Sequence, residues 1–140
     1  MSKVPVTPPY FDETHHALRD SIKRFVDKEI LPHIDDWEEQ NTFPREIYNM
    51  AGDAGFLGIG FDEKYGGTPS DVFHKLVFSQ EMMRCTSAGL VSSLGSLDIG
   101  LPPIAKWGSE ALKQKVIPPV LAGEKICALA ITEPSGGSDV

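Results

Sequence analysis

The sequence of 140 residues has little of what marks several classes of protein. It contains only two cysteines, Cys85 and Cys127, and they form no CxxC pair, so we expect two free thiols and no disulfide framework. The N-terminus lacks the apolar core of a secretory signal. The longest uncharged stretch, 85–97, is shorter than the roughly 18 residues that suggest a membrane span. We therefore expect a cytoplasmic protein without a membrane span.

Positive charge is also in short supply. The chain has 13 Lys and Arg against 20 Asp and Glu, which gives a formal net charge of -7. Because nucleic-acid binding requires a basic face, nucleic acid is not expected to be the main partner. The acidic pairs Asp35-Asp36 and Glu38-Glu39 fall on a polar segment, which indicates a solvated helix face in preference to acid–base chemistry.

Recognisable metal and dinucleotide motifs are absent as well. None of the four histidines has the i, i+4 or HxH spacing of metal ligands, so we predict no metal site and interpret them as surface or helix-end residues: His15, His16, His33 and His74. Gly58-Ile59-Gly60 resembles the start of a GxGxxG motif, but no clear strand precedes it and no helix opens there. The run is therefore interpreted as a structural turn.

Hydrophobic periodicity predicts a mostly α chain of about six helices. The expected helices are 12–31, 34–39, 44–54, 70–83, 86–106 and 109–116. Asp12 and Ser70 are the predicted caps of two of them, and the first should stop at Pro32. Pro118 and Pro119 should limit the last helix, because proline lacks the N–H that a helix interior needs.

A single apolar run, 126–131, predicts a buried strand at the end of the chain. One strand alone leaves its N–H and C=O groups unpaired, so we expect further chain or a partner to complete the sheet. The predicted fold is thus an N-terminal helical bundle over residues 1–125. Residues 126–140 would form the first strand and loop of a β domain.

Two segments could contact a ligand. The helix at 86–106 is rich in small residues and carries one charge, Asp98, before Lys106 at its end, so we expect it to be buried on most sides. It could serve tight helix packing, or it could form one wall of an apolar tunnel with Leu90, Val91 and Leu94. The turn at 132–139 offers hydroxyls and close backbone approach, which suit an anion such as a pyrophosphate or a reduced flavin, although a plain β-turn has the same composition.

The stretch from Ala130 to Asp139 resembles the T-E-P-x-x-G-S-D motif of the acyl-CoA dehydrogenase family. Further family motifs recur in the same order and extend the resemblance over about 12–140: Phe43-Pro44, Gly55-Phe56-Leu57-Gly58, Glu63-Lys64-Tyr65-Gly66-Gly67, Gly108-Ser109-Glu110 and Ala122-Gly123-Glu124-Lys125. The resemblance implies the first helical domain and the first strand of a longer α+β flavoenzyme with three domains.

The resemblance implies an FAD-dependent oxidoreductase of fatty acid metabolism and β-oxidation. Such an enzyme desaturates an acyl-CoA thioester at the α and β carbons: a glutamate takes the α-proton, and hydride leaves to flavin N5. Electrons usually pass to electron-transferring flavoprotein, and the full-length enzyme is often a homotetramer. The catalytic glutamate is expected beyond Val140, so no catalytic residue is expected within this chain, which alone should be inactive.

By the resemblance, Leu129, Ala130, Ile131 and Thr132 line the pyrimidine side of the flavin. The backbone of Ile131 and Thr132 and the Thr132 hydroxyl would hydrogen-bond flavin N1 and O2, where reduced flavin gathers negative charge. Gly137 and Ser138 would lie near the FAD pyrophosphate, with Ser138 also near the acyl-CoA. The family often has an aromatic residue where this chain has Leu129, and Glu133 is expected to be structural.

Two alternatives remain open at this point. An acyl-CoA oxidase or a flavin monooxygenase-like relative would share these motifs, since the domains that control reaction with oxygen are not in this chain. A non-catalytic helical interaction module would be favoured if the chain were naturally this short. The intact TEP motif at 132–134 favours the dehydrogenase.

Overall fold

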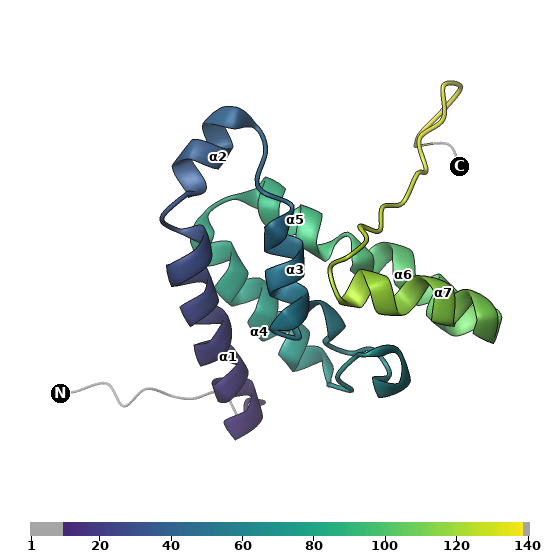
Figure 1. Ribbon diagram of the computed structural model, residues 1–140, viewed down its shortest axis with the longest axis horizontal. Coiled ribbons are helices and arrows are strands. Elements are labelled where there is room, and N and C mark those ends of the chain that lie inside the picture. Colours follow the sequence, from purple (N-terminus) through teal and green to yellow (C-terminus); the bar gives the residue numbers. More distant parts are fainter. Residues whose placement is uncertain (1–9, 139–140) are drawn as a thin grey trace.

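Seven α-helices account for most of the computed structural model, which describes residues 10–138 (Figure 1). Their bounds are α1 Glu13–Phe25, α2 Ile34–Gln40, α3 Glu46–Asp53, α4 Val72–Met82, α5 Ala88–Gly95, α6 Leu97–Trp107 and α7 Glu110–Leu121. In Figure 1, α1, α3 and α4 stand next to one another, α2 caps one end, and α6 and α7 form a pair at the other side. The mostly helical fold expected from the sequence is therefore confirmed.

The first helix begins where the sequence predicts. The Asp12 carboxylate accepts hydrogen bonds from the backbone N–H of Thr14 (2.9 Å) and His15 (3.2 Å), so it caps α1. The helix continues beyond Phe25 as a π-helical turn, Val26–Ile30, in which the Leu31 N–H donates to the Val26 carbonyl over 2.9 Å. The expected end near residue 31 is thus confirmed, with a wider last turn than the periodicity predicts.

Two glycines let α3 approach the end of α7 closely. A Cβ at Gly123 would collide with the Tyr48 carbonyl, and a Cβ at Gly52 would collide with the backbone of Ala122. Gly123 also has a φ of 73°, in the left-handed region that other residues avoid. The contact seals one end of a core that contains Tyr48, Ile117 and Leu121 among its buried side chains.

Two predicted helix ends are wrong. Asp71, not Ser70, caps α4, because its carboxylate accepts from the N–H of Phe73 (2.9 Å) and His74 (3.1 Å), while the Ser70 hydroxyl donates to the Thr68 carbonyl (2.8 Å). The last helix runs on to Leu121, through both prolines. The prolines leave the carbonyls of Gln114 and Lys115 without an i+4 donor. The i→i+4 pattern resumes after them, because the Pro118 carbonyl accepts from Ala122 over 2.9 Å, and the Pro119 carbonyl accepts from Lys125, beyond the helix end, over 2.9 Å.

The long helix expected at 86–106 is two helices that meet at Ser96, α5 and α6. By length and composition Ala88–Trp107 would pass for a membrane span, with 20 residues and a mean hydropathy of 1.2. Each helix alone is shorter than the about 20 residues that cross a bilayer, and α6 contains Pro102 and Pro103. Only 22% of the stretch is buried, so the expectation of a helix buried on most sides is wrong for the described residues.

The strand expected at 126–131 does not form within the described residues. The chain leaves α7 as an extended segment that projects from the helical body (Figure 1). Its apolar side chains are half exposed: Ile126 46%, Leu129 51% and Ile131 50%. A strand needs a neighbour to pair its backbone, and none lies beside this segment in the described part of the chain.

Both thiols are free, as predicted: Cys85 is buried and Cys127 is half-buried.

Candidate functional site

The extended segment after α7 is anchored where α5 meets α6. The Ser96 hydroxyl donates a hydrogen bond of 2.6 Å to the Cys127 carbonyl. The Cys127 sulfur lies beside Gly100, in the space that the Cβ of any other residue at position 100 would occupy. The first residues of the segment are therefore fixed to the helical body. Partial burial in this contact also raises the pKa of the Cys127 thiol above its ordinary value.

Beyond this anchor the backbone is open for contact with a ligand or another strand. Residues 128–132 make no backbone hydrogen bond within the part of the chain that the structure describes. A tight turn follows, in which Glu133 and Gly136 exchange backbone hydrogen bonds of 2.8 and 3.1 Å. The turn brings Thr132 against Gly137, whose ideal Cβ position lies 3.3 Å from the Thr132 hydroxyl oxygen.

This arrangement fits the donor and acceptor set that a flavin ring edge and a pyrophosphate require. The free N–H groups of Ile131 and Thr132 and the exposed Thr132 hydroxyl lie on one stretch of chain. Gly137 has no side chain to block approach, and Ser138 is exposed next to it. The structure thus brings Thr132 and Gly137 together, while binding by residues 129–132, 137 and 138 stays a prediction.

The three residues predicted to line a tunnel on α5 do not share one environment. Leu90 and Leu94 are 2% and 1% exposed and belong to the core, whereas Val91 is half-buried. Helix packing accounts for the burial of Leu94, whereas Leu90 is both part of the core and a lining residue of the pocket described next, and contact of these residues with substrate stays a prediction. The open positions of α5 are Gly89 and Gly95, where an added Cβ would meet no atom within 4 Å.

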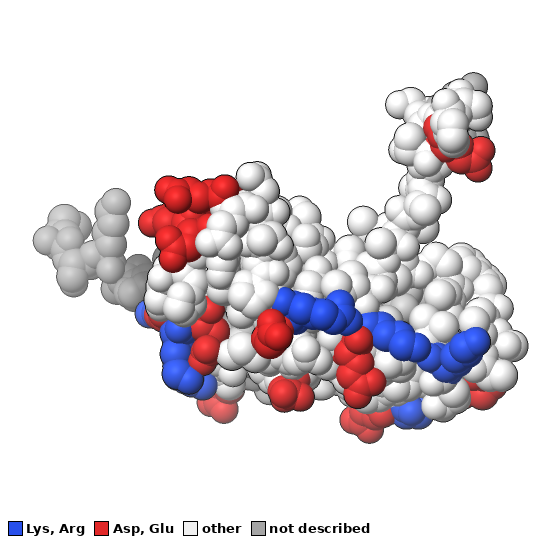
Figure 2. Space-filling model, turned by 45° about the horizontal axis from the view of Figure 1, so that its top comes forward, with Lys and Arg blue, Asp and Glu red and all other residues white. Residues whose placement is uncertain are grey.

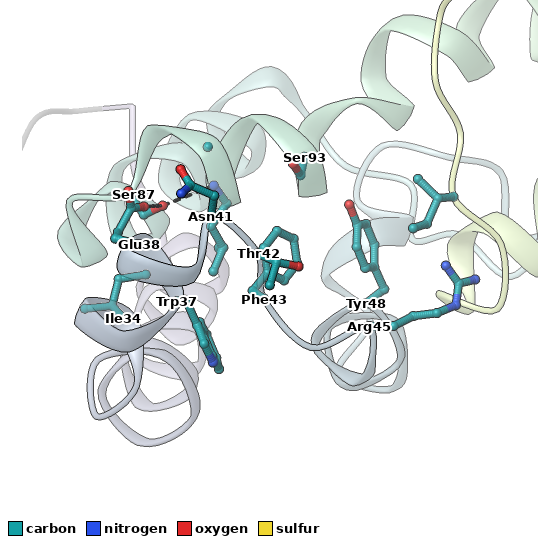
Figure 3. Close-up of a pocket in the computed structure, with 13 residues that line it drawn as sticks. Ile34, Trp37, Glu38, Asn41, Thr42, Phe43, Arg45, Tyr48, Ser87 and Ser93 are labelled. Carbon is teal, nitrogen blue, oxygen red and sulfur yellow. Dashed lines mark hydrogen bonds between the residues drawn. The ribbon is translucent and has the colours of Figure 1, made fainter.

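A pocket of about 510 Å³ lies between α5 and the α2–α3 region (Figure 3). Its apolar walls are aromatic and aliphatic side chains of three elements together with Ile126: Ile34, Trp37, Phe43, Tyr48 and Leu90. The ring centroids of Phe43 and Tyr48 are 5.6 Å apart, and those of Trp37 and Phe43 are 6.4 Å apart. The sequence does not predict this pocket, because its residues are far apart in the chain; the one local signal is the recurrence of aromatic residues between positions 37 and 48.

The two charged side chains at this pocket, Glu38 and Arg45, already have hydrogen-bond partners. The Ser87 hydroxyl donates to the Glu38 carboxylate, and the Arg45 guanidinium donates to the Glu124 carbonyl over 2.5 Å. Figure 3 shows the Tyr48 hydroxyl directed toward α5, and burial raises the pKa of this phenol. The pocket is therefore an aromatic groove with a polar rim, and both of its charged side chains are hydrogen-bonded to neutral groups.

A second cluster joins the starts of α1 and α4. His15, Asp71 and His74 each place a potential metal-ligand atom within 4.8 Å of the others. Asp71 Oδ1, however, already accepts from the N–H groups of Phe73 and His74 as the cap of α4. Hydrogen bonds from His15 and His74 hold the pKa of Asp71 well below its usual range. The geometry is thus explained by helix capping, which the sequence could not reveal because the partners are 56 residues apart.

Surface charge is unevenly distributed. Asp and Glu side chains gather at the end of the molecule formed by α2, and Lys and Arg form a band across the neighbouring face (Figure 2). The acidic side chains of α2 are exposed, as the sequence predicts: Asp35, Asp36, Glu38 and Glu39.

Known proteins share both the sequence and the fold of this chain. The profile of the family described as "Acyl-CoA dehydrogenase, N-terminal domain" matches residues 12–124. The long-chain specific acyl-CoA dehydrogenase, mitochondrial, of Mus musculus is 38% identical over 130 residues, which are 93% of this chain and 30% of that protein. The chain therefore spans about a third of the length of this relative.

Solved structures agree. The crystal structure of acyl-CoA dehydrogenase from Geobacillus kaustophilus superposes with a TM-score of 0.87 at 40% identity, covering 95% of this chain and 35% of the other. An acyl-CoA dehydrogenase from Bacillus anthracis, solved in complex with FAD, gives a TM-score of 0.85 at 32% identity, covering 95% of this chain and 23% of the other.

Proposed function

Because the chain belongs to the acyl-CoA dehydrogenase family by its N-terminal domain, we propose that it is part of an FAD-dependent acyl-CoA dehydrogenase. The proposed reaction oxidises an acyl-CoA thioester to the α,β-unsaturated thioester. The match over residues 12–124, on a fold shared with solved dehydrogenases, is the observation that carries this proposal. Residues 1–125 would form the helical domain, and residues 126–140 would begin the β domain.

Within that enzyme this chain would contribute one edge of the cofactor site. The N–H groups of Ile131 and Thr132 and the Thr132 hydroxyl would donate hydrogen bonds to the cofactor ring. The backbone at Gly137 and the Ser138 hydroxyl would hold a phosphate oxygen. FAD, when bound, supplies the acceptor for the hydride that leaves the β-carbon. Donors aimed at the place where negative charge develops stabilise the reduced state without reorganisation.

The helical domain would shield the acyl chain from water. Leu90 and Leu94 of α5 pack in the buried core, which would hold this helix in place as one wall of the substrate site. The open face of that helix would then be free to contact substrate. Transfer of electrons to electron-transferring flavoprotein and assembly as a homotetramer remain proposals that follow from the family. A cytoplasmic location remains a proposal from the sequence alone.

The test is an anaerobic titration of the purified full-length enzyme with a series of acyl-CoA thioesters. We expect the protein to carry FAD and its visible flavin absorbance to bleach as the enoyl product forms. Reoxidation by electron-transferring flavoprotein and slow reaction with oxygen would mark a dehydrogenase. Rapid production of hydrogen peroxide would identify an oxidase instead. An enzyme without FAD, or one that no acyl-CoA reduces, would contradict the proposal.

A further inference from the structure

We propose that a pocket lined by four lysines binds a small phosphate monoester with an apolar body. The pocket, called here the lysine pocket, has a volume of about 550 Å³ and lies between α6, α7, the start of α4 and the loop at 60–65. No residue of 126–138, which includes the segment proposed to hold the flavin, lines it. The inference therefore concerns a separate site and goes beyond the proposed function.

The lysine pocket concentrates positive charge in an acidic protein. The chain has 13 Lys and Arg and a formal net charge of -7, yet four lysines and a single carboxylate, that of Asp62, line this one pocket. The lysines come from four elements, the turn Glu63–Tyr65, α4, α6 and α7: Lys64, Lys75, Lys106 and Lys113. The fold therefore brings them together, since no basic run in the sequence does.

Two of these lysines have acidic partners just outside the lining. The Lys75 ammonium pairs with the Asp98 carboxylate. Lys64 Nζ lies 3.6 Å from Glu110 Oε2. The carboxylate of Asp62 accepts a hydrogen bond of 3.0 Å from the Lys64 N–H, as the cap of its turn. These three carboxylates are therefore already engaged within the protein.

Lys106 and Lys113 are the lysines available to a ligand. Neither forms an ion pair within residues 10–138. Lys106 Nζ lies instead 4.8 Å from the centroid of the Trp107 ring, which is exposed and so attracts the ammonium only weakly. A phosphate monoester carries a charge of about −1.5 to −2 at pH 7. Two ammonium groups, each a compact charge with three donors, match that charge.

The remaining lining of the lysine pocket suits an apolar body. Phe61 and Tyr65 are 7% and 4% exposed, so the core holds both rings in place. Pro102 and Ala105 of α6 complete the apolar lining. The volume of about 550 Å³ lies in the range of roughly 300–1,000 Å³ that small-molecule sites occupy. Inorganic phosphate would leave this apolar surface in contact with water, so a phosphate ester is the better fit.

The experiment titrates the full-length protein with phenyl phosphate, inorganic phosphate and phenol, by isothermal titration calorimetry at low ionic strength. Phenyl phosphate joins a phosphate monoester to an apolar ring, and the other two compounds each supply one half of it. We expect phenyl phosphate to bind roughly tenfold more tightly than inorganic phosphate, because its ring buries apolar surface. Phenol should show no binding, because it lacks the charge that the lysines attract.

Variants then locate the bound ligand. Lys106→Gln and Lys113→Gln should each weaken the binding of phenyl phosphate roughly tenfold, the effect of losing one hydrogen bond from a charged donor. Lys113→Arg keeps the charge and should retain most of the affinity. Lys115→Gln is the matched control, because Lys115 is exposed on the same helix as Lys113 and does not line the pocket. It should leave the affinity unchanged, and thermal unfolding checks that each variant is folded.

Several results would overturn the inference. One is the absence of phenyl phosphate binding to the wild type, and another is binding that both Lys106→Gln and Lys113→Gln leave unchanged. Equal weakening by Lys115→Gln would show only an effect of net charge. Equal affinities for phenyl phosphate and inorganic phosphate would show that the apolar lining contributes nothing.

If one of the two lysine variants unfolds, the other gives the same comparison with the Lys115→Gln control. None of these measurements uses the oxidation of acyl-CoA. Failure of this inference and failure of the proposed function can therefore be told apart.

Discussion

The imidazole Nε2 of His15 lies 3.0 Å from Asp71 Oδ1, which joins the first turn of α1 to the cap of α4. On its other side His15 Nδ1 is 2.7 Å from Asp12 Oδ1, the cap of α1 itself. His15 is 3% exposed, so one buried ring connects two helix N-termini that the chain separates by 56 residues. His74, whose Nδ1 is 2.9 Å from Asp71 Oδ1, completes the cluster.

This cluster predicts a pH dependence of stability. Hydrogen bonding to Asp71, together with Asp12, raises the pKa of His15, whereas the pKa values of Asp12 and Asp71 are lowered, Asp12 chiefly by Thr14 and Asp71 chiefly by His15. The contribution of His15 is complete below its unfolded pKa of about 6.5 and is lost as pH rises through the folded value. That of the aspartates is present above about pH 4 and is lost on acidification. Stability from the cluster should therefore peak between about pH 4 and 6.5.

Thermal unfolding measured across pH checks this. In His15→Gln the decline in melting temperature above about pH 6.5 should largely disappear, because the titrating ring is gone. His16→Gln is the matched control, since His16 is an exposed neighbour on the same helix whose side chain makes no hydrogen bond or ion pair among residues 10–138. Equal pH profiles for His15→Gln and the wild type would contradict the assignment.

Gly123→Ala should destabilise the protein more than Gly55→Ala. Both glycines have positive φ, 73° and 77°, so each alanine carries the left-handed strain of about 1–2 kcal/mol. At Gly55 nothing lies within 4 Å of the new Cβ, whereas at Gly123 it would collide with the Tyr48 carbonyl. Chemical denaturation of both variants measures the difference. Equal losses of unfolding free energy in the two variants would show that the close approach of Gly123 to Tyr48 adds no further destabilisation.

Thr132→Val in the full-length enzyme should slow flavin reduction by roughly tenfold, which corresponds to the loss of one hydrogen bond. Folding should change little, because Thr132 is exposed and outside the core. Ser135→Ala, in the same turn and likewise exposed, is the control and should leave reduction unaffected. Rapid-mixing measurements of flavin bleaching with saturating acyl-CoA give the rates. Identical rates for Thr132→Val and wild type would contradict the proposed hydrogen bond from the Thr132 hydroxyl.

The chain of 140 residues by itself should neither retain FAD nor oxidise acyl-CoA. Its proposed cofactor residues lie on a segment that projects from the helices, so they present one edge of a site and enclose nothing within residues 10–138. The prediction is tested by incubating the chain with excess FAD, separating it by gel filtration and measuring the flavin absorbance of the protein fraction. Flavin retained in a one-to-one ratio with the chain would show that this edge binds without the rest of the enzyme.

Structural features that depend on a few neighbouring residues can be predicted from the sequence. Asp12 caps α1 as predicted, since a cap depends on local backbone chemistry. The cap of α4 was misplaced by one residue, because Ser70 and Asp71 are both good caps and only the long-range partner His15 favours Asp71.

Features that depend on distant contacts were missed. The aromatic groove joins Trp37, Tyr48 and Gly89 from three helices, and no local pattern connects them. The strand at 126–131 was predicted from composition, yet its formation requires a neighbouring strand that residues 10–138 do not contain. The motif at 132–139 indicates the family for a different reason. Its resemblance depends on the identity of its residues and not on whether the strand before it forms.

The π-helical turn at Val26–Ile30 has a consequence for insertions and deletions. Lys28 is 83% exposed there and would look like a residue the chain could lose. A π-helical turn holds one residue more than an α-helical turn, so deleting Lys28 would convert the i→i+5 bond between Leu31 and Val26 to the α-helical i→i+4 pattern. Ile30, which is 0% exposed, would then stay on the face that packs in the core. A deletion at this exposed lysine should therefore be tolerated better than a further insertion.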